Sequence, residues 1–433
     1  MSISVVILAA GKGTRMKSAT PKVLHPISGK PMLFHALDAA QKVSDDVTVV
    51  LHHQYDRVRE AVEAEYKKVR FHHQDAERYP GTGGALRGIE FRHDRVLILN
   101  GDMPLVTTAS LLRLSDAPGD LAMSVIELDD PSGYGRVVIE GGEVREIVEE
   151  KDCTPEQRRI RSVNAGVYCV DRALLERCIP TLSNDNAQGE YYLTDIVKMA
   201  VDEGLRVTPV YVEEEEFKGV NSRVDLAHAE ELMQRRIRRY WMMQGVTMHL
   251  PETIYIDSRS EFLGECELES GVQILGRSRI ENTHIKAHSV VEDAVIRDSS
   301  VGPMARIRPQ SNLSHSQIGN FVEVKKSMLK GVKAGHLSYL GDAEIGEGTN
   351  IGAGVITCNY DGKAKYRTII GRNVFVGSDS QLVAPVTLED ETLIAAGTTV
   401  TDDVPSGALA IARTPMKIVE GFFDKFFNKG RRS

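Results

Sequence analysis

Residues 370–400 read IGRNVFVGSDSQLVAPVTLEDETLIAAGTTV, and every sixth residue of this stretch is apolar. The apolar positions are Ile370, Val376, Leu382, Leu388, Ile394 and Val400. A period of six fits neither an α-helix nor a strand with one buried face, whose periods are about 3.6 and 2. It is typical of a hexapeptide β-helix, in which three repeats make one triangular coil. The stretch therefore predicts a left-handed parallel β-helix of hexapeptide repeats.

The same spacing continues towards the N-terminus. It relates the apolar positions Tyr339, Ile345 and Ile351, and further back Val295, Val301, Ile307 and Leu313. We expect about nine coils, stacked at the ~4.8 Å spacing of neighbouring strands. The pattern breaks at 326–333 and at 357–367, where we expect loops that leave the coils. The tail 420–433 fits either a short amphipathic helix or a frayed end.

The first half of the chain alternates strand-like and helical segments. Apolar runs at Val5–Ala9, Val47–Leu51 and Val96–Leu99 are separated by amphipathic stretches such as 31–43. This alternation predicts an α/β, Rossmann-like, mostly parallel sheet covered on both faces. Ligands of such sheets bind beyond the carboxyl ends of the strands.

Residues 223–244 are expected to form one long helix that ends at Gly245. Its apolar stripe consists of Leu226, Ala229, Met233, Ile237 and Tyr240. Its basic cluster consists of Arg235, Arg236, Arg238 and Arg239, which we interpret as a solvated face that pairs with acids. The chain is therefore divided into a domain at 1–222, a linker helix at 223–245 and a β-helix domain with its tail at 246–433.

Composition limits the classes of partner and compartment. The 61 acidic residues outnumber the 53 basic ones, giving a net charge of −8, so no overall field attracts nucleic acid or an anionic membrane. The five cysteines are scattered without a Cys-x-x-Cys pair, which argues against a disulfide framework or a structural zinc site. The N-terminal apolar run is too short for a signal peptide and ends in glycines. We expect a cytoplasmic protein without nucleic-acid or membrane partners.

The first predicted strand runs into the glycine loop AGKGTRM at 10–16, and Lys22 follows shortly after. The loop is not a Walker A motif, and Met16 stands where a dinucleotide fingerprint needs its third glycine. Glycines let backbone N–H groups approach a phosphate, and Arg15 and Lys22 add two cations. Taken alone, the loop fits a phosphate site and a glycine turn flanked by solvated bases equally well.

The buried run Leu97–Leu99 is followed by Asn100, Gly101 and Asp102. This places a carboxylate at the edge of the sheet where ligands bind. Mg²⁺ is usually held by one or two carboxylates together with substrate phosphates. An Asp at this position can also be a turn or cap residue. Together with the glycine loop, the metal interpretation is the better one.

Motifs across both halves resemble known sugar-nucleotide enzymes. In the first half they are LAAGKGTRM (8–16), NGDMPL (100–105), GYGRVV (133–138), IVEEKD (147–152), VNAGVY (163–168) and GVNSR (219–223), which resemble the sugar-nucleotide pyrophosphorylases. In the second half they are RIRP (306–309), GNFVEVKKS (319–327), KAGHLSYLGDAEIGEGTNIGAG (333–354), TCNYDG (357–362), GSDSQLVAP (377–385) and AAGTTVT (395–401). Together they resemble the bacterial bifunctional N-acetylglucosamine-1-phosphate uridyltransferase/glucosamine-1-phosphate N-acetyltransferases.

The resemblance implies two activities. The C-terminal domain would transfer acetyl from acetyl-CoA to the amine of glucosamine 1-phosphate. The N-terminal domain would then transfer uridyl from UTP to N-acetylglucosamine 1-phosphate with Mg²⁺, releasing pyrophosphate. The product, UDP-N-acetylglucosamine, would supply peptidoglycan and lipopolysaccharide synthesis. The resemblance also implies a homotrimer with the acetyl-transfer site between neighbouring prisms.

The resemblance also implies the uridyl-transfer site. The UTP phosphates would contact Leu8, Ala9, Ala10, Gly11, Arg15 and Lys22. The uracil would contact Gln74, Gly81 and Thr82, and the sugar would contact Gly135, Glu149 and Asn164. Asp102 and Asn221 would hold Mg²⁺, with Asn221 also contacting the nucleotide sugar. A general base is not needed, because the sugar phosphate is already an anionic nucleophile. One departure is Gly84, where the family often has His.

For acetyl transfer, His336 corresponds to the catalytic base and Glu323 is a candidate to orient it. An imidazole that titrates near neutral pH suits the removal of a proton from an amine. The remaining positions are Arg308, Lys325, Tyr339 and Asn350 for the sugar phosphate, and Ala353, Asn359, Tyr360, Ser378, Ala396 and Arg413 for acetyl-CoA.

Two other classes of function stay open at this point. One is a pyrophosphorylase for another sugar, whose β-helix only regulates or assembles; the absence of CoA release from glucosamine 1-phosphate and acetyl-CoA would favour it. The other is a catalytically silent nucleotidyltransferase-like scaffold, which would release no pyrophosphate from UTP. The presence of Lys22, Asp102 and Asn221 argues against the scaffold, and His336 with Arg308 argues against the single activity.

Overall fold

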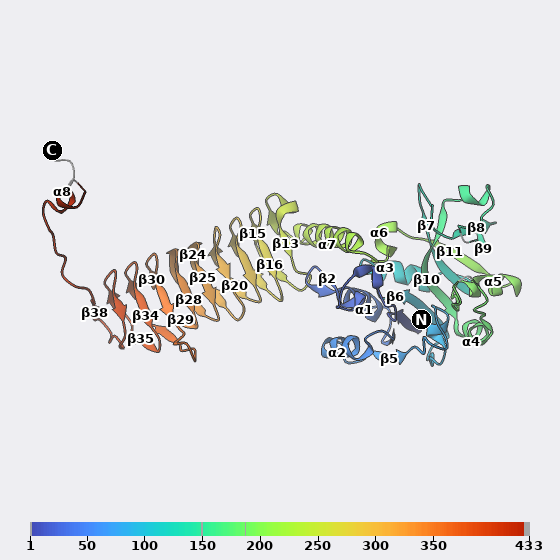
Figure 1. Ribbon diagram of the computed structural model, residues 1–433, viewed down its shortest axis with the longest axis horizontal. Helices are drawn as coiled ribbons and strands as arrows, with labels where there is room; N and C mark the ends of the chain where they lie inside the picture. Colours follow the sequence, from blue (N-terminus) through green and yellow to red (C-terminus); the bar gives the residue numbers. More distant parts are fainter. Residues whose placement is uncertain (1, 149, 187, 428–433) are drawn as a thin grey trace. The chain divides into compact units, whose positions relative to one another are not determined.

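The structure is a computed structural model that describes residues 2–148, 150–186 and 188–427. The chain forms two compact units, residues 1–237 and 238–433, which are described separately (Figure 1). The division falls within helix α7 (Arg223–Met243), which matches the long helix expected at 223–244. The domain limits 1–222 and 246–433 stay predictions. Among the described residues, no helix is long and apolar enough to cross a membrane.

The first unit is built on one twisted sheet. Its strands lie in the order β11 (Val207–Tyr211), β7 (Leu121–Glu127), β10 (Ser162–Asp171), β6 (Arg95–Asn100), β1 (Ile3–Leu8), β4 (Asp46–Leu51) and β5 (Arg70–His73). All neighbours are parallel except β10, which is antiparallel to both β6 and β7. The hairpin of β8 (Arg136–Glu140) and β9 (Glu143–Val148) extends from β10, and β2 (Pro26–Ile27) pairs with β3 (Lys30–Pro31). The predicted mostly parallel α/β sheet is confirmed.

Helices cover both faces of this sheet. The α-helices are α1 (Met32–Gln41), α2 (Tyr55–Glu65), α3 (Thr108–Ser115), α4 (Arg172–Thr181), α5 (Asp195–Asp202), α6 (Glu214–Phe217) and α7. The short 3₁₀ turns are Thr14–Met16, Lys22–Leu24, Gly84–Leu86 and Gln157–Arg159. Val5 and Ile7 of β1 share one core with Leu37 of α1, whereas Val6 shares the other core with Leu175 of α4. Side chains alternate across a strand, so a sheet buried on both faces reads as a continuous apolar run.

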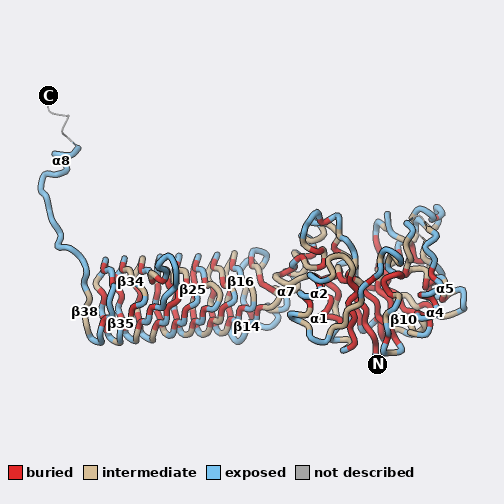
Figure 2. The backbone as a smooth tube through the Cα atoms, turned by 60° about the horizontal axis from the view of Figure 1, so that its bottom comes forward, coloured by how far each residue is buried: buried red, intermediate tan, exposed pale blue. Residues whose placement is uncertain are grey.

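The second unit is a parallel β-helix with three faces, and Figure 2 shows its buried residues along the inside of the coils. The 3₁₀ turn Pro251–Thr253 lies within its first coil. The first face contains β12 (Thr247–Met248), β15 (Glu267–Leu268), β18 (His284–Ile285), β21 (Ser300–Val301), β24 (Gln317–Asn320), β27 (Lys333–His336), β30 (Asn350–Ile351), β33 (Phe375–Val376), β36 (Leu393–Ile394) and β38 (Leu409–Ala410). The second contains β13 (Tyr255–Ile256), β16 (Gln273–Leu275), β19 (Val290–Glu292), β22 (Arg306–Ile307), β25 (Glu323–Lys325), β28 (Tyr339–Gly341), β31 (Ile356–Cys358), β34 (Gln381–Val383) and β37 (Thr399–Val400). The third contains β14 (Glu261–Leu263), β17 (Arg279–Glu281), β20 (Val295–Arg297), β23 (Asn312–Ser314), β26 (Met328–Lys330), β29 (Ala343–Ile345), β32 (Thr368–Ile370) and β35 (Val386–Leu388).

The six-residue period is confirmed from residue 370 onwards, because all six apolar positions between Ile370 and Val400 are buried. Further upstream the prediction is wrong at two positions. Val295 and Tyr339 are only half-buried, and Ile296 and Leu340 fill the core instead. Paired core residues of these coils lie 16 or 17 residues apart, against 18 later in the chain. A strict period of six therefore slips by one residue in the shorter coils.

The two predicted loops have different outcomes. Residues 326–333 do not leave the prism, since β26 and the start of β27 lie within them and pair with neighbouring coils. Residues 359–367 do leave it, between β31 and β32, and an antiparallel bridge joins Tyr360 to Lys365. The six-residue pattern breaks at 326–333 because the coils there are shorter. At 359–367 it breaks because a loop lengthens the coil.

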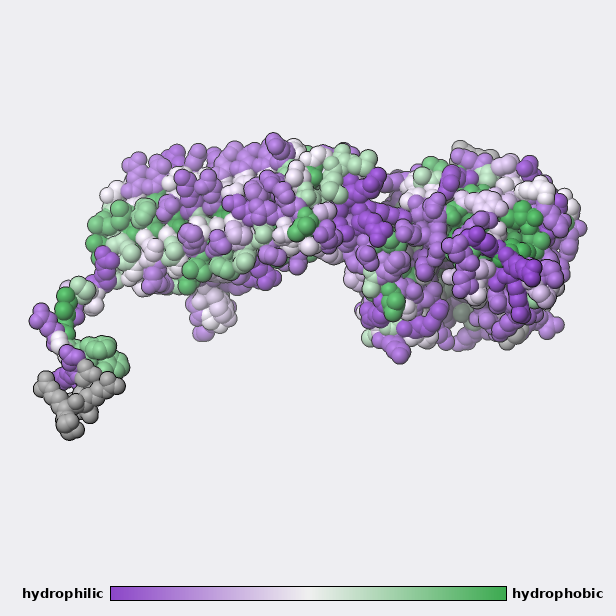
Figure 3. All heavy atoms as spheres, turned by 90° about the horizontal axis from the view of Figure 1, so that it is seen from above, coloured by the Kyte–Doolittle hydropathy of each residue, from purple (hydrophilic) through white to green (hydrophobic). Residues whose placement is uncertain are grey.

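Apolar side chains remain exposed at the end of the β-helix. Phe375, Leu393 and Leu409 pair in register on the first face and are each about half exposed. Figure 3 shows hydrophobic surface over these C-terminal coils. After the last coil, α8 (Phe422–Phe427) forms the short helix that was one of two expectations for the tail, and the remaining tail residues 428–433 lie outside the described residues.

Candidate functional sites

The glycine loop lies at the carboxyl end of β1, beside the ends of β4 and β6. Ala9 N–H donates to Val50 O, and Gly101 N–H donates to Leu8 O, so the loops after β1 and β6 meet at one edge of the sheet. Gly11 and Arg15 are exposed. Parallel strands bring their carboxyl ends to the same edge, which is where the sequence placed the ligand.

Two adjoining hollows open at this edge. One, of about 660 Å³, is lined by the predicted residues Leu8, Ala10, Gly11, Gln74, Gly81 and Thr82. The other, of about 490 Å³, is lined by the predicted residues Arg15, Asp102, Asn164 and Asn221. Asn100 lines both. The first hollow therefore contains most of the predicted nucleotide residues, whereas Arg15 lies in the second with both predicted metal ligands and the predicted sugar residue Asn164. Ala9, Lys22 and Gly135 line neither hollow.

The loop that carries Gly81 and Thr82 is held by side-chain hydrogen bonds. The Gln74 amide nitrogen donates to Tyr79 O and to Gly81 O, each at 3.0 Å. Thr82 Oγ1 accepts from Leu193 N–H at 3.1 Å. Both of these bonds use the amide nitrogen of Gln74, whose amide oxygen is an acceptor.

Glycine is required twice in this loop. Gly81 has a φ of +90°, and a Cβ there would lie 2.6 Å from Tyr191 O. At Gly84, where the family often has His, a Cβ would lie 2.2 Å from Tyr79 O. The departure from the family pattern is therefore built into the packing of this loop against its own backbone.

Asp102, Asn221 and Lys22 form one cluster. Lys22 Nζ lies 2.5 Å from Asp102 Oδ2 and 2.8 Å from Asn221 Oδ1. Asn221 precedes helix α7, and its backbone N–H donates to Asp225 at 3.0 Å. Asp225 and Ser222 cap α7 reciprocally, since Ser222 N–H donates to the Asp225 carboxylate and Asp225 N–H donates to Ser222 Oγ.

Burial tends to raise the pKa of the Asp225 carboxyl, but the hydrogen bonds from Ser222 and Asn221 outweigh it and hold that pKa below its usual value. The start of the long helix therefore fixes one of the two predicted metal ligands.

The donor set fits Mg²⁺ when phosphates complete it. Asp102 offers a carboxylate and Asn221 an amide oxygen, and hard oxygen ligands of this kind suit Mg²⁺. Within the described ranges, no group of three or more His, Cys, Asp or Glu side chains could hold a metal by itself. Two protein ligands leave the remaining positions to substrate and water, which is the usual arrangement for this ion.

The predicted sugar residues lie beside this cluster. Asn164 Oδ1 accepts from Gly166 N–H at 3.0 Å, and Asn164 Nδ2 donates to Tyr168 Oη at 2.7 Å. The backbone of Gly135 accepts from Asn164 N–H, which places these two predicted residues together. Glu149 lies outside the described residues.

In the β-helix, three of the four predicted sugar-phosphate residues lie on the second face, and the fourth, Asn350, lies on β30 of the first face. Core residues Ile307, Val324 and Leu340 point inwards, so Arg308 and Lys325, which follow Ile307 and Val324, point outwards. A Cβ at Gly341 would lie 2.4 Å from Tyr339 Oη, so the Tyr339 ring lies over Gly341. Because Lys325 pairs with Gly341, this ring lies close to the lysine.

Lys365 was missed by the sequence analysis. Its amino group lies beside that of Lys325, and the pKa of Lys365 is lowered because a neutral Lys365 amine can accept a hydrogen bond from Lys325 and because two positive charges there repel each other. Lys365 comes from the loop 359–367, so only the folded loop brings it there. Asn100 was also missed, although it stands in the motif NGDMPL, between the buried run Leu97–Leu99 and Asp102. Two adjacent ammonium groups with Arg308 nearby favour a doubly charged anion such as a phosphate monoester.

Glu323 pairs with Arg308. Arg308 Nη1 donates to Glu323 Oε1 at 2.7 Å, and this bond raises the pKa of the Arg308 guanidinium. His336 is exposed at the end of β27, and in the part of the chain that the structure describes its imidazole makes no hydrogen bond. The structure therefore places Glu323 with the sugar-phosphate cations, and the predicted Glu323–His336 contact is absent among the described residues.

The predicted acetyl-CoA residues lie on successive coils. Asp379 N–H donates to Ala353 O, and Gly397 N–H donates to Ser378 O, so Ala353, Ser378 and Ala396 follow one another along one edge. Arg413 Nη1 donates to Ala396 O at 2.9 Å. Asn350, on β30, pairs with Lys333 of β27, the strand that ends in His336.

The remaining two acetyl-CoA residues lie in the loop 359–367. Asn359 is buried, with Nδ2 2.5 Å from Asp342 Oδ2, and Tyr360 is exposed. Asn359 therefore holds the base of this loop, while the exposed Tyr360 ring has its hydroxyl tied to Gly362 O at 2.8 Å within the same loop.

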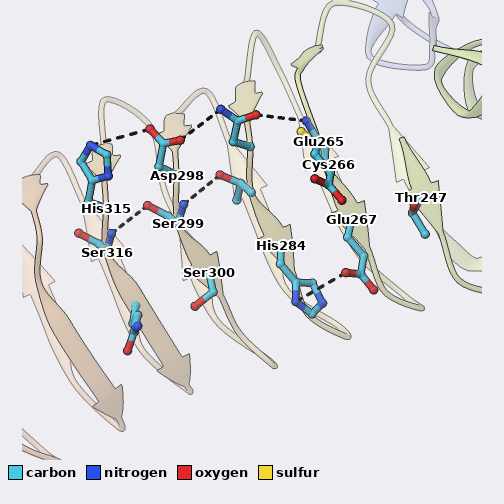
Figure 4. Close-up of a pocket in the computed structure, with 13 residues that line it drawn as sticks. Thr247, Glu265, Cys266, Glu267, His284, Asp298, Ser299, Ser300, His315 and Ser316 are labelled. Carbon is cyan, nitrogen blue, oxygen red and sulfur yellow. Dashed lines mark hydrogen bonds and ion pairs between the residues drawn. The ribbon is translucent and has the colours of Figure 1, made fainter. Parts of the chain in front are cut away.

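A further polar hollow, of about 620 Å³, lies on the early coils of the β-helix (Figure 4). Asn282 accepts from Glu265 N–H and donates to Asp298, and His315 approaches the same carboxylate. These polar groups therefore pair with one another along the stack of coils. No predicted site residue lines this hollow, and its polar ladder is explained by coil stacking.

Known proteins are similar to this chain along its whole length. Residues 5–165 match the family described as MobA-like NTP transferase domain, and residues 367–402 match the hexapeptide repeat of succinyl-transferase. The chain is 69% identical over 427 residues to the bifunctional protein GlmU of a Sulfurovum species, covering 99% of each. It is 61% identical to that of a Nitratiruptor species, over 99% of this chain and 100% of the relative.

A third full-length relative has a lower identity. The bifunctional protein GlmU of Wolinella succinogenes is 58% identical over 431 residues, covering 100% of both chains. Among solved structures, the inositol-1-phosphate CTP transferase from T. maritima covers 54% of this chain and 95% of its own, with 17% identity and a TM-score of 0.44. On the full-length matches, this chain belongs to the family of bifunctional proteins named GlmU.

Proposed function

We infer that this protein is a bifunctional enzyme that makes UDP-N-acetylglucosamine. Its β-helix transfers acetyl from acetyl-CoA to glucosamine 1-phosphate, and its N-terminal unit transfers uridyl from UTP to the resulting N-acetylglucosamine 1-phosphate. The observation that carries this conclusion is a full-length match of 69% identity to a bifunctional GlmU. The product supplies the synthesis of peptidoglycan and of lipopolysaccharide.

For uridyl transfer, we propose that the first hollow binds UTP. The Gln74 amide oxygen and the backbone at Gly81 and Thr82 would contact the uracil. The glycine loop, Arg15 and Lys22 would contact the phosphates, because backbone N–H groups and cations stabilise phosphate charge. Leu8, Ala9, Ala10 and Gly11 supply that backbone.

The sugar phosphate would enter through the second hollow, beside Gly135, Glu149 and Asn164. Its phosphate oxygen would attack the α-phosphorus of UTP. A bond forms between this oxygen and the α-phosphorus, and the bond between the α-phosphorus and the leaving pyrophosphate breaks. Mg²⁺, held by Asp102 and Asn221 with the phosphates, would neutralise charge on the reacting groups. Because the nucleophile is already an anion, these residues position groups and neutralise charge without a general base.

For acetyl transfer, we propose that the cations Arg308, Lys325 and Lys365 bind the sugar phosphate, with Tyr339 and Asn350 on the sugar. Glu323 would orient Arg308. His336 would take a proton from the sugar amine, whose nitrogen then forms a bond to the thioester carbon as the carbon–sulfur bond breaks and CoA leaves. The uncommitted imidazole of His336 suits this role, since its nitrogens are not held by hydrogen bonds within the described residues.

We also propose where acetyl-CoA lies. The edge formed by Ala353, Ser378 and Ala396 carries only small side chains, which would let the pantetheine arm approach the coils, and Arg413 at its end would meet the CoA phosphates. Asn359 and Tyr360 would lie near the acetyl group.

We propose a homotrimer that acts in the cytoplasm. The half-exposed ladder of Phe375, Leu393 and Leu409 supports burial against further copies, since exposed apolar patches of this kind mark interfaces. A closed cyclic assembly would cover the same face on every copy. The five free thiols fit a reducing compartment.

Two separate assays on the wild-type protein test the inference. One measures CoA release from glucosamine 1-phosphate and acetyl-CoA without UTP, and the other measures pyrophosphate release from UTP and N-acetylglucosamine 1-phosphate without acetyl-CoA. The inferred function requires both. Pyrophosphate release alone would favour a single-activity pyrophosphorylase, and neither release would favour a catalytically silent scaffold.

A further inference from the structure

The Lys22 ammonium lies where a divalent cation would have to bind. Lys22 Nζ contacts Asp102 Oδ2 at 2.5 Å and Asn221 Oδ1 at 2.8 Å, so it bridges the two oxygens assigned to the metal. The side chains of Lys22 and Asp102 are only 13% and 20% exposed. In this state a cation of the chain itself pairs with the Asp102 carboxylate and donates to the Asn221 amide oxygen.

Backbone contacts hold the two oxygen ligands in place. Val220 N–H donates to Asp102 O at 2.9 Å, and Gly219, where a Cβ would lie 3.3 Å from Asp102 Oδ1, lets the carboxylate pack against the chain. The Asn221 side-chain nitrogen donates to Gly219 O at 3.4 Å, which turns its amide oxygen towards Lys22. None of these contacts of Asp102 and Asn221 involves Lys22.

The base of the Lys22 side chain is fixed, but its end is flexible. At Gly13, where φ is +59°, a Cβ would lie 2.5 Å from Lys22 Cβ, so the glycine loop packs on the start of this side chain. The glycine loop also lies against Lys22 Cγ and Cδ, so that only the end of the side chain, Cε and the ammonium, would turn to another anion. The same glycine loop is the proposed phosphate site, so a triphosphate would bring its anionic oxygens close to this ammonium.

The Lys22 ammonium and a divalent ion would compete for the same space between Asp102 Oδ2 and Asn221 Oδ1. A divalent ion bound by Asp102 and Asn221 would sit about 2.0–2.1 Å from each oxygen, which is the space that Nζ fills. Two cations so close repel strongly where water is largely excluded.

We propose that Lys22 is a displaceable internal cation that keeps Mg²⁺ off Asp102 and Asn221 until the triphosphate of UTP draws its ammonium away. The proposal rests on the uridyl-transfer function proposed above. It makes Lys22 a positioning residue for the metal in addition to a phosphate contact. It also implies that the metal enters together with the nucleotide and binds the free enzyme poorly.

The test measures Mn²⁺ binding to the full chain without nucleotide, by the loss of the free-Mn²⁺ electron paramagnetic resonance signal. Lys22→Met should bind Mn²⁺ at least about tenfold more tightly than the wild type, because a repelling charge is removed. Lys12→Met is the matched control, since Lys12 belongs to the same loop but lines the other hollow, and it should change the affinity little. Adding Asp102→Asn to Lys22→Met should abolish the gain.

A second arm adds a non-hydrolysable UTP analogue to the wild type, which should raise its Mn²⁺ affinity beyond that of the analogue alone. Equal or weaker Mn²⁺ binding by Lys22→Met, in a protein whose thermal unfolding matches the wild type, would overturn the proposal. If Lys22→Met does not fold, Lys22→Gln carries the same comparison. Failure of uridyl transfer by the wild type would instead count against the proposed function, so the two failures are distinguishable.

Discussion

Among single residues, His336 is the one on which the proposed acetyl transfer depends most. If its imidazole takes the proton of the sugar amine, His336→Ala should lower the turnover of acetyl transfer by about 10²–10⁴-fold, the usual contribution of general-base catalysis and roughly 3–5 kcal/mol of barrier. Uridyl transfer, which lies in the other unit, should keep its rate.

Glu323 provides the contrast to this variant. Because its carboxylate binds Arg308 and not His336, Glu323→Gln should mainly raise the Michaelis constant for glucosamine 1-phosphate. Steady-state kinetics of both variants separate these effects. A His336→Ala protein with near-normal turnover and a raised Michaelis constant would make His336 a binding residue and leave the base to be found elsewhere.

The residues that sequence reasoning placed well are those next to a backbone feature. Asp102 follows a buried strand and Gly11 follows another, so the sheet alone brings them to one edge. Glu323 and Lys365 were harder, because their partners come from other coils or from the loop 359–367. Which side chain meets which across stacked coils depends on register, and register depends on coil lengths that a period of six does not reveal.

At the scale of structural elements, coil length decides which residues form the core of the β-helix. Ile296 is fully buried while Val295, one residue earlier, is half-buried, which is the reverse of the strict six-residue period. Ile296→Ala should therefore destabilise the β-helix by about 2–5 kcal/mol, through lost burial and the cavity left behind.

The matched variant Val295→Ala should cost much less. Urea unfolding followed by circular dichroism compares the two midpoints. Equal losses of stability, or a larger loss for Val295→Ala, would favour a uniform six-residue period and contradict the observed register.

Helix α7 shows what the sequence predicted and what it missed about an element. Its extent was predicted within one residue, and Arg236 of its basic cluster does pair with an acid, Glu216. Its apolar stripe was only partly right, since Ala229 is buried but Tyr240 is 56% exposed. A helical period identifies the helix, but the side that packs depends on what the rest of the chain offers.

At the scale of the whole molecule, the two activities are expected to be separable. The first unit extends to residue 237, and Ala229 and Leu232 of α7 belong to its core, while Glu230 accepts from Ser28 N–H. A chain of residues 1–245 should therefore be soluble and retain uridyl transfer. A chain of residues 1–222, which lacks these contacts, should be less stable to thermal unfolding. An insoluble 1–245 chain would contradict this independence.

The fold classes of both halves followed from the sequence, because strand alternation and a six-residue repeat each leave few alternatives. The exact division of the chain did not follow. The change of period near Gly245 marks where the coils begin, but it does not show that part of the helix before it packs on the first unit.

The Asp102→Ala variant tests whether one chain carries two independent catalytic sites. With glucosamine 1-phosphate, acetyl-CoA, UTP and Mg²⁺ all present, ³¹P nuclear magnetic resonance follows each phosphorus-containing product. We expect N-acetylglucosamine 1-phosphate to accumulate while UDP-N-acetylglucosamine and pyrophosphate do not form. This follows because only the uridyl site has lost its metal ligand. Loss of both products from a folded protein, or continued formation of UDP-N-acetylglucosamine, would contradict it.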